Sequence, residues 1–251
     1  MALKTAPPPL RNNNAPFTRA ETVKVFLFGL FLPGIFLAPT CLLGAWIHTF
    51  PSIPSPWFGL LVTIATTSLA YVSSMVLLLK HPRIVRERMS KLYPDNNDDL
   101  TEKRFFRLAA PLAGVGYLFV AWNASRQGDT FPYLWNYVGS LMLLVGFLWI
   151  AMVFRENPFA SKIVYKQEDQ RLITTGPYQI VRHPMYLGVI FLVNGFSLSL
   201  GSFLGILPMS LFCVLTGWRT YHEEQFLLHT FSSDYVTYCT QVKYRMIPLV
   251  F

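Results

Sequence analysis

Two polar clusters in the C-terminal part of the sequence contain residue types suited to binding an anion. The first is Gly176-Pro-Tyr-Gln-Ile-Val-Arg-His-Pro-Met-Tyr-Leu-Gly188. Gly-Pro favours a turn and Pro184 suits the first turn of a helix, so Arg182 and His183 are expected at a helix N-terminus. Such a terminus attracts negative charge. The same residues would also suit an anchor that contacts lipid headgroups, and composition alone leaves both interpretations open.

The second cluster is Arg219-Thr-Tyr-His-Glu-Glu224. In a continuous helix Arg219 and Glu223 are four residues apart and share a face. An ordinary ion pair on a solvated surface is the simpler interpretation. Two features favour a site instead: adjacent glutamates are unusual for a membrane anchor, and a preceding hairpin would return this cluster to the face that carries Arg182 and His183.

The composition predicts that these clusters lie beside a membrane. Of the 251 residues, 53% are hydrophobic and 14% are charged, against about 25% charged in soluble domains. This excludes a water-soluble enzyme, a disordered chain and a nucleic-acid-binding domain. The net charge of +8 suits a membrane face. The three cysteines show no disulfide or metal spacing, and we expect no metal.

Apolar runs divide the chain into about six membrane segments. Four apolar runs are each read as one segment. The fifth run, 186–217, is uncharged and far longer than the roughly 20 residues that cross a membrane. Small flexible residues at Gly201-Ser202 favour a turn, so this run is expected to form two arms of a hairpin. The predicted fold is therefore an all-α polytopic membrane protein. Its predicted segments are 23–47, 57–79, 108–123, 133–154, 186–200 and 203–217.

The positive charges predict the orientation of these segments. If the segments alternate, 20 of the 21 Lys and Arg residues fall on one side, which places both termini in the cytosol. The predicted organisation is a disordered tail (1–22), four transmembrane helices (23–154) and a C-terminal catalytic region (155–251). Aromatic residues at helical spacing after Leu227 predict a tail helix, in which packing is their expected role. In a eukaryotic host the expected membrane is the endoplasmic reticulum.

The ordered set of motifs resembles the isoprenylcysteine carboxyl methyltransferase family of integral membrane enzymes. The set comprises Gly176-Pro-Tyr-x4-His-Pro-x-Tyr-x-Gly188, Arg219-x3-Glu-Glu224, Phe231-x3-Tyr-x2-Tyr-x3-Val242 and Ile247-Pro248. Gln170 and Met185 stand where the eukaryotic prenylcysteine enzymes typically have His and Ser. The stretch Glu156-Asn-Pro-Phe159 and the Gly176-Pro-Tyr form resemble divergent or bacterial-type members more closely.

The resemblance implies a methyltransferase that uses S-adenosylmethionine, with its cofactor pocket on the cytosolic side. It implies that Glu223 meets the amino group of the cofactor and that Arg219 addresses the carboxylate of the substrate, which makes these two the expected catalytic residues. The other cofactor-binding residues that it implies are Gln170, Arg171, Leu172, Ile173, Tyr178, His183, Pro184, Met185 and Tyr186.

The expected reaction suits these residue types. A carboxylate is already ionised at neutral pH (the reference pKa of Glu is about 4.3), so the enzyme mainly has to position the reactants. Arg219 can orient the carboxylate by charge-assisted hydrogen bonds. The acceptor is expected to be lipophilic, such as a prenylcysteine terminus or a terpenoid acid that arrives from the bilayer.

Three alternative functions remain open from the sequence. A phospholipid or other amine N-methyltransferase would need a base, and His183 or Glu224 could serve. An NADPH-dependent sterol-type reductase has a similar C-terminal architecture. A transporter or assembly factor would not be an enzyme, but it predicts charged or broken helices at the membrane midplane, whereas the polar residues here gather at one face.

Overall fold

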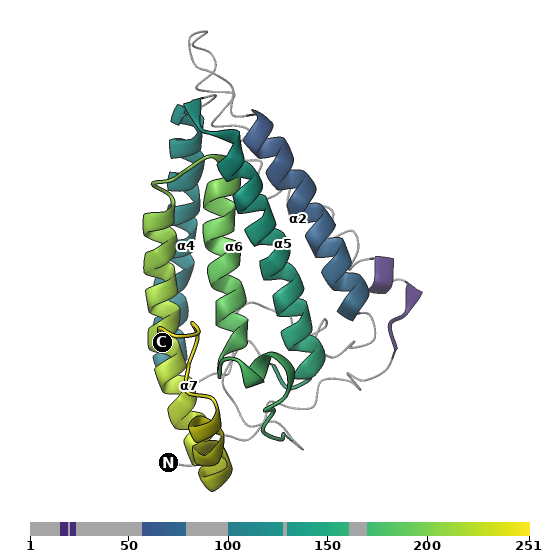
Figure 1. Cartoon of the computed structure of the whole chain (residues 1–251), viewed down its shortest axis with the longest axis vertical. Coiled ribbons are helices and arrows are strands. Elements are labelled where there is room, and N and C mark those ends of the chain that lie inside the picture. Colours follow the sequence, from purple (N-terminus) through teal and green to yellow (C-terminus); the bar gives the residue numbers. More distant parts are fainter. Residues whose placement is uncertain (1–15, 20, 24–56, 79–99, 128–129, 161–169) are drawn as a thin grey trace.

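A computed structural model describes residues 16–19, 21–23, 57–78, 100–127, 130–160 and 170–251, and all regular structure within these ranges is helical. The predicted all-α fold is thus confirmed for the described part of the chain. The helices stand side by side in one bundle, with the most extensive contact between α5 and α6 (Figure 1). They are α2 (Trp57–Leu78), α4 (Leu100–Gln127), α5 (Tyr133–Glu156), the short 3-10 helix η2 (Gly176–Gln179), α6 (Pro184–Leu200) and α7 (Ile206–Gln241).

Among the residues that the structure describes, two helices are long and apolar enough to cross a membrane. They cover Thr101–Gln127 and Tyr133–Glu156, and α6 is a shorter apolar helix. Large apolar side chains such as Leu134 and Leu141 of α5 are mostly exposed, which suits a surface that faces lipid. The first predicted span, 23–47, lies almost wholly outside the described residues. The six-span topology therefore stays a prediction.

The third predicted span, 108–123, lies within a longer helix. Helix α4 begins at Leu100 and ends at Gln127, with Pro111 inside it. Its additional first turns contain charged residues, which hydropathy assigned to a loop. Glu102 lies in the first turn of α4, where the positive end of the helix dipole favours a carboxylate.

The predicted hairpin break at Gly201-Ser202 is confirmed, but its second arm is much longer than predicted. Gly201 follows α6 with φ +97°, a left-handed conformation that glycine adopts readily. Ser202 Oγ donates to Asn123 Oδ1 at 2.7 Å and accepts from the Gly205 amide at 3.0 Å, which fixes the turn. Helix α7 then continues past residue 217 to Gln241.

A kink divides α7 near its end. Ser232 has φ +45° and ψ −115° inside the helix, a combination that L-residues rarely adopt. The residues that follow turn beneath the bundle instead of extending away from it (Figure 1). The predicted tail helix is therefore the kinked end of α7.

Close packing of α5 against α6 fixes the position of α6. A Cβ atom on Gly139 would lie 2.2 Å from the backbone nitrogen of Ser199, so glycine is required for this approach. At the other end, Trp149 Nε1 donates to the Pro184 carbonyl at 2.8 Å. These contacts determine where the first residues of α6 lie.

Candidate active site

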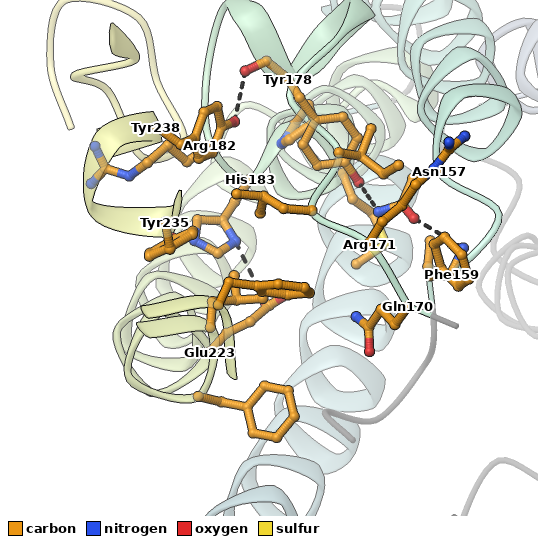
Figure 2. A pocket seen from close by; sticks show the side chains of 18 of the residues that line it. Asn157, Phe159, Gln170, Arg171, Tyr178, Arg182, His183, Glu223, Tyr235 and Tyr238 are labelled. Atoms are coloured by element: carbon orange, nitrogen blue, oxygen red, sulfur yellow. Dashed lines mark hydrogen bonds and ion pairs between the residues drawn. The ribbon is translucent and has the colours of Figure 1, made fainter. Parts of the chain in front are cut away.

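An open cavity lies at the end of the bundle where α6 begins. The empty space within it and at its mouth, open solvent included, is about 900 Å³. Its wall comes from four parts of the chain: the residues after α5, the segment 170–173, η2 with the start of α6, and α7 (Figure 2).

The structure gathers every site residue expected from the sequence around this cavity. The residues are Gln170, Arg171, Leu172, Ile173, Tyr178, His183, Pro184, Met185, Tyr186, Arg219 and Glu223. They come from segments up to 53 positions apart that meet only through the α6–α7 hairpin. Their roles toward a cofactor or substrate stay predictions.

Glu223 and His183 face each other at the cavity wall. His183 Nδ1 lies 3.6 Å from Glu223 Oε2 (Figure 2). The Tyr186 hydroxyl donates to the same oxygen at 3.0 Å. The His183 side chain is only 3% exposed, and its Nε2 has no hydrogen-bond partner within the described part of the chain.

The neighbouring Glu224 is buried in an ion cluster and does not line the cavity. Arg182 Nε donates to Glu224 Oε1 at 2.7 Å, and Arg245 Nε donates to Oε2 at 2.8 Å. His183 Nε2 lies 3.5 Å from Oε1. Burial opposes ionisation of Glu224, but the adjacent His183 and Arg182 lower its pKa to about 2. Of the two glutamates, Glu223 therefore faces the cavity.

Arg182 ties the residues after α7 to the start of α6. Its Nη1 donates to the carbonyls of Val242 and Lys243 at 2.8 and 2.9 Å. The amides of Arg182 and His183 donate to the carbonyls of Tyr244 and Arg245. The sequence indicated that Arg182 could attract an anionic ligand, but the anion beside its guanidinium is Glu224.

Arg219 pairs with Glu102 of α4 and not with Glu223 of its own helix. Arg219 Nε and Nη2 donate to the two Glu102 oxygens at 3.2 and 2.8 Å. The guanidinium carbon lies 4.7 Å from the ring centre of Phe105 and 5.4 Å from that of Phe106. The interpretation as a solvated surface pair is therefore wrong, because Arg219 is 7% exposed.

Three tyrosines form a further part of the wall: Tyr178, which the resemblance assigned to the cofactor pocket, and Tyr235 and Tyr238, which the sequence assigned to packing. The Tyr178 hydroxyl accepts from Asn157 Nδ2 at 2.8 Å, and the Tyr238 hydroxyl donates to the Tyr178 carbonyl at 2.7 Å (Figure 2). Tyr235 is almost fully buried. Burial raises the pKa of Tyr235 and Tyr238, so both stay neutral.

Several lining residues were missed from the sequence. Spacing along a helix could have identified those on α7, but it does not separate a ligand-facing aromatic from a packed one. No group of three His, Cys, Asp or Glu residues that could hold a metal occurs among the described residues. The missed lining residues are Asn157, Phe159, Ala160, Phe226, Leu227, Phe231, Tyr235 and Tyr238.

The cavity belongs to a segment that is similar to known proteins. Residues 134–234 match the phospholipid methyltransferase family. This segment contains α5, α6 and most of α7. It includes the residues from the start of α6 and from α7 that line the cavity up to Phe231.

Curated relatives align with part of the chain. Probable protein-S-isoprenylcysteine O-methyltransferases from the indica and japonica subspecies of Oryza sativa are 33% identical over 115 residues, which is 43% of this chain and 58% of theirs. A Delta(14)-sterol reductase of Mus musculus is 30% identical over 105 residues, 39% of this chain and 25% of the reductase. The chain thus spans only part of each relative.

These matches, with the membrane-length helices, support a membrane methyltransferase. A methyltransferase of this kind implies S-adenosylmethionine as methyl donor. The resemblance to prenylcysteine methyltransferases is supported, whereas a divergent or bacterial-type subtype stays a prediction.

Proposed function

We propose that the protein is an S-adenosylmethionine-dependent carboxyl O-methyltransferase that acts on a lipophilic acid. The observation that carries this proposal is the pairing of opposite charges at one cavity. Glu223 presents a carboxylate and Arg219 a guanidinium to the same space, so the cavity can receive a cationic donor and an anionic acceptor together.

The residues present suit the donor. Glu223, which lines the cavity, could accept hydrogen bonds from its amino group. Leu172 and Tyr178 supply apolar and aromatic surface for a base. When bound, the donor would supply an electrophilic methyl group: the carboxylate oxygen forms the new C–O bond as the S–CH₃ bond breaks, and the bonding electrons return to sulfur.

The other role of the cavity residues is to position the acceptor. Arg219 orients the acceptor carboxylate, which needs no base because it is already ionised near neutral pH. Apolar side chains of the same cavity, including Met185, Phe226 and Phe231, can contact the hydrocarbon part of the substrate. A prenylated cysteine terminus and a hydrophobic metabolite such as a terpenoid acid both fit this description.

We also propose that the cavity and both termini face the cytosol, in the endoplasmic reticulum of a eukaryotic host. The distribution of Lys and Arg supports this orientation. Arg171, Arg182 and Arg245 lie at the cavity end of the bundle, whereas the α6–α7 turn carries no charge.

A phospholipid or amine N-methyltransferase is the second candidate. The match to the phospholipid methyltransferase family favours it. An ammonium acceptor must lose a proton before transfer, and His183, which lines the cavity, could accept that proton. The stability of the methylated product in mild alkali distinguishes an O-methyltransferase from an N-methyltransferase.

The test incubates the purified protein with methyl-labelled S-adenosylmethionine and either lipophilic acids or phospholipid amines. A carboxyl methyl ester releases labelled methanol in mild alkali, whereas an N-methyl group does not. We expect alkali-labile label on an acid, its loss in Arg219→Gln, and its retention in the exposed control Asp234→Asn. Alkali-stable label on an amine would replace the proposal with the second candidate.

A further inference from the structure

A buried carboxylate on α4 contacts the cavity arginine from outside the segment that matches the phospholipid methyltransferase family. Glu102 is 4% exposed and precedes the matched residues 134–234. A buried charge is costly unless it is paired. Its ion pair joins it to Arg219, 117 positions later, so α4 contributes to a cavity whose lining side chains come from other elements.

Helix α4 fixes the Arg219 guanidinium on several sides. Glu102 accepts two hydrogen bonds from Nε and Nη2, a bidentate arrangement that restricts rotation of the guanidinium plane. Phe105 and Phe106 lie within 5.4 Å of the guanidinium carbon. All three contacts come from the first two turns of α4, while Arg219 also lines the cavity.

We propose that Glu102 is a positioning residue for the transfer reaction. It sets the direction in which Arg219 faces the acceptor and offsets part of the positive charge of Arg219. This inference rests on the carboxyl methyltransferase function proposed above.

The partial neutralisation of the Arg219 charge by Glu102 matters because the acceptor carboxylate is also the nucleophile. A guanidinium with no carboxylate partner would bind the acceptor tightly and withdraw electron density from the attacking oxygen. Since Nε and Nη2 already donate to Glu102, a substrate carboxylate cannot occupy that bidentate edge without displacing Glu102. The acceptor is therefore oriented by Arg219 without being held in an unreactive ion pair.

The test is Glu102→Gln, which keeps the shape of the side chain and removes its charge. We expect kcat for the acid to fall about tenfold or more, because the acceptor takes the bidentate edge and points away from the methyl group. We expect KM for the acid to fall as well, because the ground-state complex becomes tighter. The S-adenosylmethionine Kd, measured by calorimetry, should change less than about twofold, and Asp234→Asn should leave all three values unchanged.

A double-mutant cycle shows whether Glu102 acts through Arg219. Arg219→Lys removes the bidentate pair, so adding Glu102→Gln to that variant should change kcat less than about twofold. An equal loss of kcat in both backgrounds would mean that Glu102 has only a structural role and would overturn the proposal. Unchanged kcat and KM in Glu102→Gln alone would also overturn it.

Two further results are a Glu102→Gln variant that does not fold and a wild-type protein that methylates no acid, and each has a separate consequence. If Glu102→Gln does not fold, Glu102→Asp keeps the charge on a shorter side chain. It should retain the wild-type KM and lose kcat, and a raised KM with unchanged kcat would contradict the proposal. If the wild-type protein transfers no methyl group to any acid, the proposed function fails, and this inference fails with it.

Discussion

Two adjacent glutamates have different surroundings because they point to different sides of α7. Glu223 lines the cavity and contacts Tyr186 and His183. Glu224 is enclosed by Arg182 and Arg245. Since successive helical residues are separated by about 100° around the helix axis, one can meet a ligand while the other stabilises the wall.

Replacing Glu223 should therefore weaken binding of the methyl donor more than it lowers the stability of the fold. We expect Glu223→Gln to weaken S-adenosylmethionine binding at least about tenfold, because the carboxylate is the expected partner of a cationic amino group. Calorimetry on the purified protein measures this change. Asp234→Asn, a matched carboxylate-to-amide change at an exposed position, should bind normally; an unchanged Kd in Glu223→Gln would remove Glu223 from the donor site.

Glu224 should make the stability of the protein depend on acid pH. Its pKa is lowered to about 2 from an ordinary 4.5, so its stabilising effect is complete above about pH 4.5 and is lost as the pH falls toward 2. Thermal unfolding in detergent should show Glu224→Gln melting well below the wild type at pH 7. The difference should narrow between pH 4.5 and pH 2, and a constant difference would contradict this account.

For individual residues, the sequence predicted which ones line the cavity, but it did not predict every side chain that they contact. All the cavity residues named from the motifs line the cavity, because the α6–α7 hairpin brings the middle of α7 back to the start of α6. Glu102 was not identified because its contact with Arg219 joins positions 117 residues apart. Nothing in the local pattern around Glu102 indicates a distant arginine.

Among the elements, helix boundaries were the hardest feature to predict. The hydropathy pattern ends a span where charges begin, but the backbone hydrogen bonds of a helix can continue through charged turns. This explains why α4 begins before residue 108 and why α7 continues past residue 217. The turn at Gly201 was predictable because only glycine adopts its conformation readily.

The contact between α5 and α6 should be sensitive to a single methyl group. Gly139→Ala would place Cβ 2.2 Å from the Ser199 nitrogen, so the helices must separate at a cost of about 2 kcal/mol or more. Gly114→Ala is the matched control, because no atom lies within 4 Å of the added Cβ and alanine favours a helix. We expect a lower Tm only for Gly139→Ala; equal Tm values would contradict the close packing.

For the whole molecule, the two ends of the bundle should face opposite sides of the membrane. Thr130 precedes α5 and Gln179 follows it, so the helix separates the two positions. In a cysteine-free background, Thr130→Cys and Gln179→Cys should react with an impermeant thiol reagent from opposite sides of sealed vesicles. Labelling of both from the same side would contradict the predicted topology.

The central claim is that the cavity binds a methyl donor, and calorimetry on the purified wild-type protein tests it most directly. The sequence-related proteins include methyltransferases and a sterol reductase, so S-adenosylmethionine and NADPH are the ligands to compare. We predict micromolar binding of S-adenosylmethionine and no binding of NADPH. Binding of NADPH alone, or of neither ligand by folded protein, would contradict the account.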